Sequence, residues 1–377
     1  MAIRAELVVI GGGLMGSATA WAASRRGLSV LLLEQYGRGH NRGSSHGSSR
    51  IVRRGYQEPL YTELTGRSFE LWRELELDSG APLLRMLGNV DFGSRAYAES
   101  VAAQLAASVV EHEILSAPEA EQRWPGMRFE GLVVHHTQGG TVDAGAAVTA
   151  FQDGAVRRGA VVRHDTAVAS LDPTPDGGVR VLQADGAEVL AGTVVVAAGG
   201  WTGEILGGHL SLPALNVTQQ ETFHFPRRDP ASPAWPSVVH EWGAGIYHLA
   251  GGPLGGPQDD RKIGQHYGGL PTTAAGRDGV VSAATRETLV EYVKEWLPGL
   301  DPTPRTETSC LYTFTPSEDF LLDRVGPFVV CSPCSGHGAK FAPLIGELTT
   351  DLVTGAAGVP ERFRLPAHAS GTPGKTG

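Results

Sequence analysis

The sequence predicts an α/β protein whose 377 residues form two interleaved domains. The first observation is the length, which exceeds the roughly 250 to 300 residues at which a single hydrophobic core stops growing. The second is a strand, a glycine-rich turn and a helix in succession near the N-terminus. The third is the presence of 51 glycines and 24 prolines in a chain that is 41% hydrophobic. Because that hydrophobic content argues against a disordered or collagen-like chain, we expect the glycines and prolines in turns and close backbone contacts.

Charge and cysteine content limit the expected partners and compartment. The formal net charge is −9, from 31 Lys and Arg against 40 Asp and Glu, so there is no basic excess to neutralise a nucleic acid. The three cysteines, Cys310, Cys331 and Cys334, are too few for a disulfide framework. We therefore predict a cytoplasmic protein that binds neither nucleic acid nor a membrane.

The first 23 residues have the outline of a signal peptide, with a short charged start and an apolar stretch. Glu6 in the charged part and the glycines in the apolar part argue against that interpretation. A nucleotide-binding segment explains the same residues better.

This segment consists of an apolar strand at 7–10, Gly11-x-Gly13-x-x-Gly16, an alanine-rich helix, and a strand at 28–33 that ends at Glu34. Gly11 permits the tight turn, Gly13 admits a pyrophosphate, and Gly16 lets helix and strand pack closely. The helix N-terminus, with Leu14 and Met15, offers N–H groups and a positive dipole end to phosphates. Glu34 stands close to the roughly 20-residue spacing at which an acid receives ribose hydroxyls, and it disfavours NADP. The alternative is a glycine-rich turn without a ligand.

A second segment bears on the choice between NAD and FAD. Strands are expected at 162–165 and at 167–172, which contains Val168, then at 179–181 after a turn. A buried run at 193–196 follows and leads to Gly199, Gly200 and Trp201. Small residues after a buried strand let the backbone pass close to a dinucleotide. The run resembles the second fingerprint of FAD-containing amine and amino-acid oxidases, and the alternative is a core strand followed by a turn.

Later motifs make the resemblance more specific. They lie at 43–53, 262–266, 310–313, 318–323 and 335–341. In this order and spacing they resemble the monomeric sarcosine oxidase and N-methyltryptophan oxidase family, from about residue 5 to about residue 365. The resemblance implies a monomeric FAD enzyme that oxidises secondary amines of the N-methyl amino-acid type. Hydride would pass to flavin N5, dioxygen would reoxidise the flavin to give hydrogen peroxide, and the imine product would hydrolyse.

The resemblance also implies the flavin contacts. Cys310 matches the cysteine that carries the flavin as a thioether, which requires a thiolate and therefore an electropositive environment. The alternative for a lone cysteine is a small buried hydrophobe. Lys262 matches a lysine beside flavin N5, where a fixed cation favours electron transfer to dioxygen. His46 and Arg50 match residues that line the flavin face. The other cofactor residues expected here are Ser44, Ser49, Gly336, His337, Gly338 and Lys340.

The substrate residues follow from the same resemblance. Arg53 and Lys340 match the pair that holds a substrate carboxylate, for which an arginine fork and a lysine point charge are suited. The alternative for both is an ordinary surface charge. His266 matches a histidine close to the substrate and is the obvious general base, although a neutral amine can deliver its hydride without one. His248 is expected to face the substrate.

Cys331 and Cys334 have the Cys-x-x-Cys spacing of metal and redox sites. There is no second cysteine pair and no histidine at ligand spacing. We therefore expect no metal site.

The motifs divide the chain into two discontinuous domains. We assign 1–84, 140–212 and 305–366 to a Rossmann-like FAD-binding domain, and 367–377 to a flexible tail. We assign 85–139 and 213–304 to a substrate domain on an antiparallel or mixed sheet. Within it we expect an alanine-rich helix at 97–109, a capping box at Ser116 and Glu119, and an amphipathic helix through Leu289, Val293 and Trp296. A helix is also expected at 343–353.

The substrate side chain stays open, because the loop at 45–49 and the pair Tyr247 and His248 depart from the family pattern. The segment at 253–258 also matches no pattern of the family. One alternative is an oxidase or dehydrogenase of proline, pipecolate, a D-amino acid or a primary amine on the same scaffold. Another is a flavin-binding protein without catalysis.

Overall fold

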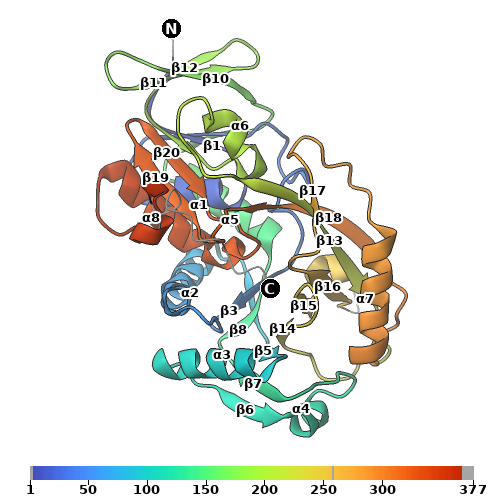
Figure 1. The fold of residues 1–377 in the computed structure, drawn as a ribbon. Helices are drawn as coiled ribbons and strands as arrows, with labels where there is room; N and C mark the ends of the chain where they lie inside the picture. The colour runs from blue at the N-terminus through green and yellow to red at the C-terminus, as the bar shows by residue number, and fades with distance from the viewer. Residues whose placement is uncertain (1–2, 257–258, 367–377) are drawn as a thin grey trace.

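The computed structural model describes residues 3–256 and 259–366 of the chain. Figure 1 shows two large sheets that lie side by side, with helices on their outer faces. The predicted α/β fold with two interleaved parts is therefore confirmed. The predicted tail at 367–377 lies outside the described residues.

The first sheet is the mostly parallel one, and it carries the N-terminus. β1 pairs in parallel with β2 on one side and with β12 on the other, and β12 also pairs in parallel with β20. The strands are β1 (Ile3–Ile10), β2 (Val30–Leu33), β9 (Val161–Arg163), β10 (Val168–Pro173), β11 (Val179–Gln183), β12 (Glu188–Val196), β19 (Leu321–Val325) and β20 (Phe328–Ser332). β2, β20 and the second halves of β1 and β12 are continuously buried, as in a parallel sheet covered on both faces.

Alternate residues of β1 pack into two different cores. Leu7 and Val9 face α1 and α8, whereas Val8 and Ile10 face the side that the β10–β11 hairpin and α6 cover. The helices around this sheet are α1 (Leu14–Arg25), α2 (Pro59–Ser79), α5 (Ala144–Val156), α6 (Thr202–Leu206) and α8 (Ala342–Thr354), with short helical turns η1 (Gly199–Trp201), η3 (Gly338–Phe341) and η4 (Glu361–Phe363). The helix expected at 343–353 agrees with α8.

The second sheet has the strand order β17-β13-β16-β15-β14-β5-β7-β6, with β18 on the other edge of β13. Its strands are β5 (Asn89–Phe92), β6 (Glu113–Ser116), β7 (Leu132–His136), β13 (Asn216–Phe225), β14 (Ser237–His240), β15 (Ile246–Ala250), β16 (Arg261–Gln265), β17 (Leu270–Pro271) and β18 (Thr306–Phe314). Its helices are α3 (Arg95–Ala107), α4 (Ala117–Arg123) and α7 (Ala283–Trp296), with the turn η2 (Gly252–Gly255). As predicted, α4 begins at a capping box, and Leu289 and Val293 of α7 are buried.

Both predicted insertions contribute strands to this second sheet, but so does β18. β18 pairs with β13 over its whole length, from Thr306 to Phe314. The segment that begins at 305 was assigned to the first domain, so the sheet topology moves its first strand into the second. A small sheet of β3 (Arg50–Arg53), β8 (Gly139–Val142) and β4 (Leu84–Met86) lies where the chain crosses between the two.

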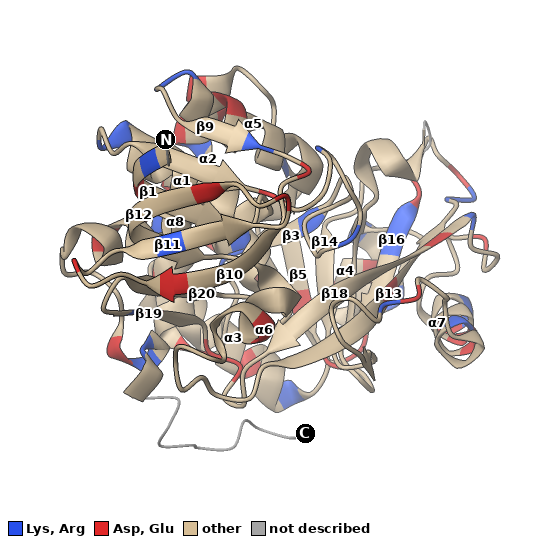
Figure 2. Cartoon of the chain, turned by 90° about the horizontal axis from the view of Figure 1, so that it is seen from above, with Lys and Arg blue, Asp and Glu red and all other residues tan. Residues whose placement is uncertain are grey.

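The two faces of the second sheet differ in character. One face is apolar and packs against α7, through Phe223, Phe225, Ile263 and Val238. The opposite face carries polar side chains, because strand residues alternate between the faces. Lys262, Tyr247, Cys310 and Asp91 share this polar face through the register of β5, β13, β14, β15, β16 and β18. In Figure 2, β16 is coloured as basic where Arg261 and Lys262 stand.

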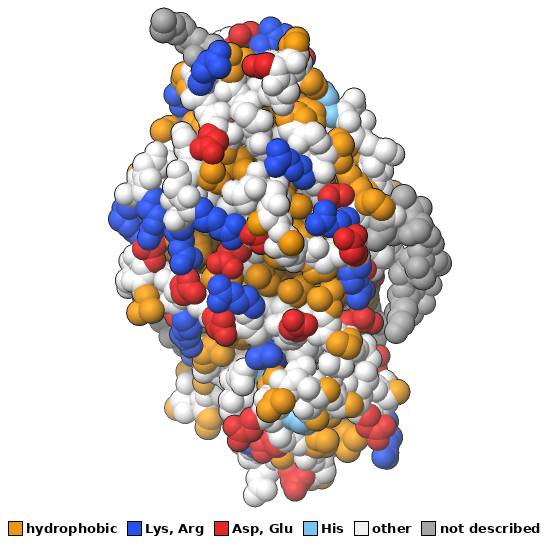
Figure 3. Space-filling view, turned by 90° about the vertical axis from the view of Figure 1, so that its left-hand side faces the viewer, with side chains coloured by type: hydrophobic (Ala, Val, Ile, Leu, Met, Phe, Trp, Pro, Cys, Tyr) orange, Lys and Arg blue, Asp and Glu red, His pale blue; other side chains and the backbone are white. Residues whose placement is uncertain are grey.

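Charged side chains of both signs mix on the surface. Figure 3, which views the side where α2 and α8 lie in Figure 1, shows basic and acidic groups interspersed. α2 alone carries the ion pairs Arg67–Glu70 and Arg73–Glu76. This face therefore presents no extended basic surface. Within the described part of the chain, none of the helices combines the length and the apolar character needed to span a membrane.

Candidate active site

The predicted glycine turn lies between β1 and α1. Gly11 has a φ of +105°, and a Cβ there would lie 2.5 Å from the backbone oxygen of Ala197, after β12. A Cβ on Gly16 would overlap the Gly11 oxygen. Only glycine therefore allows this turn and the close packing of α1 on the sheet.

The loop at 43–49 closes over the start of α1. Ser45 Oγ accepts a hydrogen bond from Leu14 N at 2.9 Å, and it lies where a Cβ on Gly13 would come within 2.9 Å. Met15 lies on the far side, where its Cε would be 3.3 Å from a Cβ on Gly338. The loops at 43–49 and 335–338 therefore both lie against the N-terminus of α1. The positive end of its dipole makes this N-terminus suited to an anion.

Glu34 ends β2 and is buried. Its carboxylate accepts hydrogen bonds from Gly12 N at 2.6 Å and from Tyr36 N at 2.9 Å. Burial by itself raises the pKa of Glu34, but the hydrogen bonds from His40, Gly12 and Tyr36 lower it below its ordinary value. Glu34 therefore stays ionised and can accept hydrogen bonds from ribose hydroxyls.

The ring of Tyr36 lies 6.0 Å from that of Trp201, edge to face. Gly199, which precedes Trp201 in η1, has open space where a Cβ would stand. Val168 begins β10 and is half-buried against the core that contains Val8 and Ile10 of β1. These positions frame one end of the site.

Arg50 organises the loop that lines the other end. Its guanidinium donates to the backbone oxygens of Ser44 at 2.8 Å, His46 at 2.7 Å and Ser49 at 2.8 Å. Ser44 Oγ donates to Leu311 O at 2.6 Å, which ties the loop to the strand of Cys310. Arg50 therefore acts on the loop's backbone and joins it to the second sheet.

Lys262 is buried on the polar face of the second sheet. Its Nζ donates to Ser49 O at 3.1 Å. Burial, assisted by the charge of Arg50, lowers the pKa of Lys262 to about 7, while Cys310 acts in the opposite direction. A lysine with such a pKa changes charge near neutral pH.

Cys310 lies in the middle of β18, opposite Gln220 of β13, and is buried. Lys262 and Arg277 are both close enough to interact electrostatically with it. Arg277, which the motifs did not single out, donates to Ser309 O at 2.7 Å and to Asn41 O at 2.5 Å. The cations that sequence analysis expected around Cys310 are therefore present.

Two buried polar groups near Lys262 have no hydrogen-bond partner among the described residues. They are His46 Nε2 and Ser49 Oγ. Burial and the charges of Arg50, Arg277 and Lys262 lower the pKa of His46 to about 3, so its ring is neutral. Buried polar atoms are normally satisfied, so these two indicate a polar ligand beside Lys262.

Arg53, the last residue of β3, and Lys340 of η3 both contact Tyr56. Arg53 Nη1 donates to Asp91 Oδ1 at 3.1 Å. Burial alone would lower the pKa of Arg53, but Asp91 raises it above the ordinary value. Lys340 Nζ donates to Tyr56 OH at 2.9 Å and to His337 O at 2.8 Å. Burial and the charge of Arg53 hold the pKa of Lys340 well below its ordinary value.

His266 and Gly336 are adjacent, although they come from different domains. Gly336 has a φ of +75°, and a Cβ there would lie 2.6 Å from His266 Cε1 and 2.7 Å from Tyr312 Cε2. Burial, followed by the charges of Lys340 and Arg53, lowers the pKa of His266 to about 4. His266 is therefore neutral at pH 7 and lies beside the two cations. A Cβ on Gly338 would overlap Pro333 O, which keeps this loop tight.

His248 does not lie with these residues. Its Nδ1 accepts a hydrogen bond from Arg261 Nε at 2.8 Å, and its ring packs 6.4 Å from that of Tyr292 on α7. It therefore points to the apolar face of the second sheet, away from Lys262. The neighbouring Tyr247 lies on the face of Lys262 instead, with its OH 3.4 Å from Tyr312 OH and its pKa raised to about 12 by burial and Cys310.

Sequence reasoning missed Tyr247 because the alternation of a strand shows which residues share a face but not which face meets the site. It also missed Tyr56 and Asp91. Tyr56 stands three residues after Arg53 and just beyond the motif at 43–53, so its closeness to that motif was a signal. Asp91 had no such signal.

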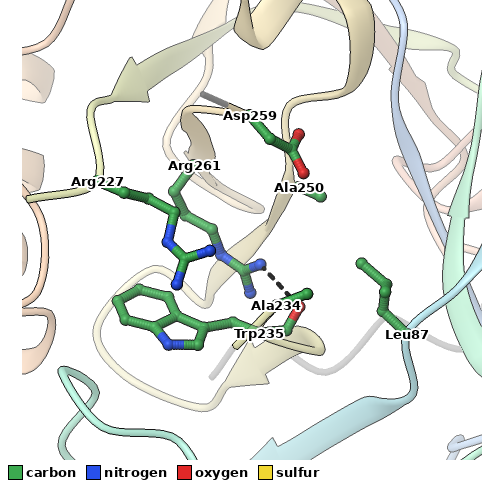
Figure 4. A pocket seen from close by; sticks show the side chains of 7 residues that line it. All are labelled: Leu87, Arg227, Ala234, Trp235, Ala250, Asp259 and Arg261. Carbon is green, nitrogen blue, oxygen red and sulfur yellow. Dashed lines mark hydrogen bonds between the residues drawn. The ribbon is translucent and has the colours of Figure 1, made fainter. Parts of the chain in front are cut away.

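A small pocket lies behind the second sheet. Figure 4 shows its lining, in which Arg227 and Arg261 lie over the ring of Trp235. Arg261 donates to Trp235 O, Pro236 O and His248 O, so its guanidinium is held by the protein itself. Lys262 is the next residue in β16, so the side chains of Arg261 and Lys262 point to opposite faces of the second sheet.

Cys331 and Cys334 are free thiols in the structure. Burial raises the pKa of the Cys331 thiol to about 12. Cys334 Sγ accepts a hydrogen bond from Thr313 N at 3.3 Å. Within 3–256 and 259–366, no group of three or more His, Cys, Asp or Glu side chains is placed to hold a metal ion.

The residues described above fit FAD. Glu34 suits ribose hydroxyls, the glycine turn and the start of α1 suit a pyrophosphate, and His46 Nε2 and Ser49 Oγ offer hydrogen bonds to a polar ring system. Cys310 lies on the second sheet, in β18, where its thiol could meet a bound flavin. This donor set matches the parts of a flavin dinucleotide.

Known proteins agree with the chemistry of the site. Residues 6–352 match the family described as FAD dependent oxidoreductase. The chain is 32% identical to the peroxisomal sarcosine oxidase of Homo sapiens, covering 92% of this chain and 91% of the relative. It is 31% identical to the monomeric sarcosine oxidase of Streptomyces avermitilis, covering 98% of each. The solved structure of NikD, an unusual amino acid oxidase essential for nikkomycin biosynthesis, is 26% identical with a TM-score of 0.84, covering 96% of each chain. The family predicted from the motifs is thereby confirmed: the chain belongs to the FAD-dependent oxidoreductases, among relatives named sarcosine oxidases.

Proposed function

We propose that the chain is an FAD-dependent oxidase of secondary amines of the N-methyl amino-acid type, of which sarcosine is the simplest. The observation that carries this proposal is the meeting of Arg53 and Lys340 at Tyr56, beside His266. Two adjacent cations on one side of a cofactor site suit the carboxylate of an amino acid. The sarcosine oxidases among the relatives support the choice of substrate.

The cofactor would be held by the residues that run from Glu34 to Cys310. When bound, FAD supplies a hydride acceptor and a route for electrons to dioxygen, with hydrogen peroxide as product. Cys310 is proposed as its covalent attachment, because its thiol stands near the cations Lys262 and Arg277. Lys262 places a cation at the edge of the site, where it would stabilise negative charge that develops on dioxygen.

The substrate would be oriented by its carboxylate. Arg53 has N–H groups besides the one that binds Asp91, and Lys340 has a third proton besides the two it donates to Tyr56 and His337. The positive charges of Arg53 and Lys340 disfavour the protonated form of an amine beside them, and the neutral ring of His266 can accept its proton. The amine can therefore react without its proton and with its carboxylate held in place.

The proposal is tested by mixing the purified enzyme, without oxygen, with sarcosine, other N-methyl amino acids, proline, pipecolate and D-amino acids. We expect an N-methyl amino acid to bleach the flavin absorbance fastest, and air to restore the colour with release of peroxide. Bleaching by proline or a primary amine alone would shift the assignment to the other activities considered above. An absence of bleaching by every amine would overturn it.

We also propose that the enzyme acts as a cytoplasmic monomer. One relative is named a monomeric sarcosine oxidase, which supports a single-chain enzyme. The free cysteines agree with a reducing compartment. Light scattering after gel filtration would test the mass, where a value near 40 kDa is expected from the 39.7 kDa chain. Fractionation of the native cell would test the compartment.

A further inference from the structure

Tyr56 touches both cations of the proposed carboxylate site. Arg53 Cζ lies 4.6 Å from the centroid of the Tyr56 ring, which is the distance of a cation–π contact. The hydroxyl of the same tyrosine accepts a hydrogen bond from Lys340 Nζ at 2.9 Å. Among the described residues Lys340 has no carboxylate partner, and its other acceptor is the backbone oxygen of His337 at 2.8 Å.

The hydroxyl of Tyr56 is held as an acceptor toward Lys340 by His337. His337 Nε2 lies 3.3 Å from Glu318 O, and its Nδ1 lies 3.2 Å from Tyr56 OH. A backbone oxygen only accepts, so Nε2 carries the ring proton and Nδ1 is free to accept. Tyr56 therefore donates to His337 and turns a lone pair toward the ammonium of Lys340. The chain Glu318, His337, Tyr56 and Lys340 is consistent in every donor and acceptor.

We propose that Tyr56 is a positioning residue that orders Lys340 and Arg53 for the carboxylate of the substrate. The proposal rests on the proposed function, because it assumes an amino-acid substrate. Lysine and arginine side chains lose much conformational freedom when a ligand orders them, so cations that are already held bind a carboxylate more tightly. The hydroxyl orders Lys340, and the ring orders Arg53.

The chain offers a matched control in Tyr61. The two tyrosine rings are stacked with centroids 5.4 Å apart. Tyr61 OH donates to Asp319 Oδ1 at 2.8 Å and makes no bond to Lys340. Tyr61→Phe therefore removes the same atom from the same aromatic cluster without touching either cation.

The variants Tyr56→Phe and Tyr61→Phe are compared with wild type as FAD-loaded enzymes. One measurement is turnover of sarcosine, and the other is titration with acetate, a carboxylate that is not oxidised, followed by the flavin spectrum. Tyr56→Phe is expected to raise the KM for sarcosine and the Kd for acetate about tenfold or more, the usual scale for a hydrogen bond to a charged group. We expect kcat to change less than about threefold, because the lost contact holds the carboxylate rather than the reacting bond. Tyr61→Phe is expected to leave both constants near wild type.

Two further variants separate the effect of the Tyr56 hydroxyl from that of its ring. In a Lys340→Met background, Tyr56→Phe should have no further effect on acetate binding, since its hydroxyl acts through Lys340. Tyr56→Leu, which also removes the ring beneath Arg53, should weaken acetate binding more than Tyr56→Phe. Flavin content and circular dichroism show whether each variant is folded.

The inference is overturned if Tyr56→Phe and Tyr61→Phe have equal effects, or if Tyr56→Phe still weakens acetate binding in the Lys340→Met background. Failure of the proposed function has a different signature, in which wild type oxidises no N-methyl amino acid. Acetate titration still tests the carboxylate site in that event. The two failures are therefore distinguishable.

Discussion

The guanidinium of Arg53 lies 3.1 Å from the carboxylate of Asp91, which is fully buried on β5. Asp91 also accepts hydrogen bonds from Tyr97 OH at 2.8 Å and from Asn89 Nδ2 at 2.7 Å. The charge of Arg53 is therefore balanced within the protein, whereas Lys340 has no acidic partner in the described part of the chain. A substrate carboxylate would raise the lowered pKa of Lys340 and favour its charged form, so Lys340 is the cation left to pair with the substrate.

Asp91→Ala would leave Arg53 largely buried without its counter-ion. Breaking such a pair on one side costs about 3–5 kcal/mol of unfolding free energy. Urea denaturation at pH 7.5 measures it. Tyr97→Phe, which removes one hydrogen bond to the same carboxylate, is expected to cost about 1 kcal/mol. Equal costs for the two substitutions would show that the ion pair does not stabilise the fold.

Arg53→Ala is expected to lower kcat/KM for sarcosine by about a hundredfold, through loss of charged hydrogen bonds to the carboxylate. Steady-state peroxide release measures this effect. Arg54→Ala is the matched control, because Arg54 is the next residue but donates to Gln138 Oε1 at 3.0 Å instead. Unchanged kinetics in Arg53→Ala would remove Arg53 from the substrate site.

Lys262 predicts a pH dependence of the reaction with dioxygen. With its pKa lowered to about 7, chiefly by burial, Lys262 is a cation at lower pH and neutral at higher pH. The reduced enzyme should therefore react with dioxygen more slowly as pH rises through about 7. Lys262→Met should be slow at every pH, while reduction by substrate is retained. Stopped-flow absorbance separates the two half-reactions, and oxygen reactivity in Lys262→Met equal to wild type would contradict the role.

Cys310→Ser tests the covalent attachment. Wild type should be heavier than its sequence by one FAD and should keep the flavin after acid precipitation. In Cys310→Ser the flavin should be released into the supernatant. Cys331→Ala is the control, because burial raises the pKa of that thiol to about 12 and leaves it unreactive. Flavin released from wild type by acid would exclude the linkage.

Buried histidines predict loss of stability in acid. Burial lowers the pKa of His46, His136 and His240 to about 3 and that of His224 and His266 to about 4. Below about pH 6.5 these histidines are protonated in the unfolded chain but stay neutral in the folded protein. The unfolding free energy therefore falls as pH falls toward 4. Each histidine contributes at most about 1.4 kcal/mol per pH unit.

Urea denaturation of wild type and His136→Gln between pH 7 and 4.5 measures this slope. His136 is suited to the test because neither of its ring nitrogens has a hydrogen-bond partner among the described residues. The variant should lose part of the pH dependence. A slope unchanged from wild type would mean that water or relaxation lets His136 accept its proton in the folded state.

Much of the first domain was predictable from local sequence. The strand before Gly11, the turn, the helix from Leu14 and the acid Glu34 are consecutive, and their geometry follows from backbone conformation and short-range packing. The same holds for α8 and for the capping box at Ser116. The roles predicted for Arg53, Lys262, Cys310 and Lys340 came from motif resemblance. In the structure Lys262 and Cys310 lie on the polar face of the second sheet. Arg53 contacts Asp91 on that sheet, and Lys340 contacts Tyr56.

The orientation of the strands in the second sheet was not predictable in this way. His248 and Tyr247 are neighbours, and an alternating strand assigns them to opposite faces without saying which face is which. The pairing of β14 with β5, and of β18 with β13, joins segments far apart in the chain. β18 therefore pairs with the second sheet although its segment was assigned to the first domain, and His248 lies on the face away from Lys262.

Local sequence is enough to specify the nucleotide-binding turn, its helix and its acid, because those contacts span few residues. Tertiary structure alone places Asp91 against Arg53 and Tyr56 against Lys340. These contacts connect β5 to β3, and the segment after β3 to η3. The physical reason is that charge pairing and strand register depend on which distant segments share a buried surface. The counter-ion of Arg53 and the tyrosine that contacts Lys340 therefore became visible only in the folded molecule.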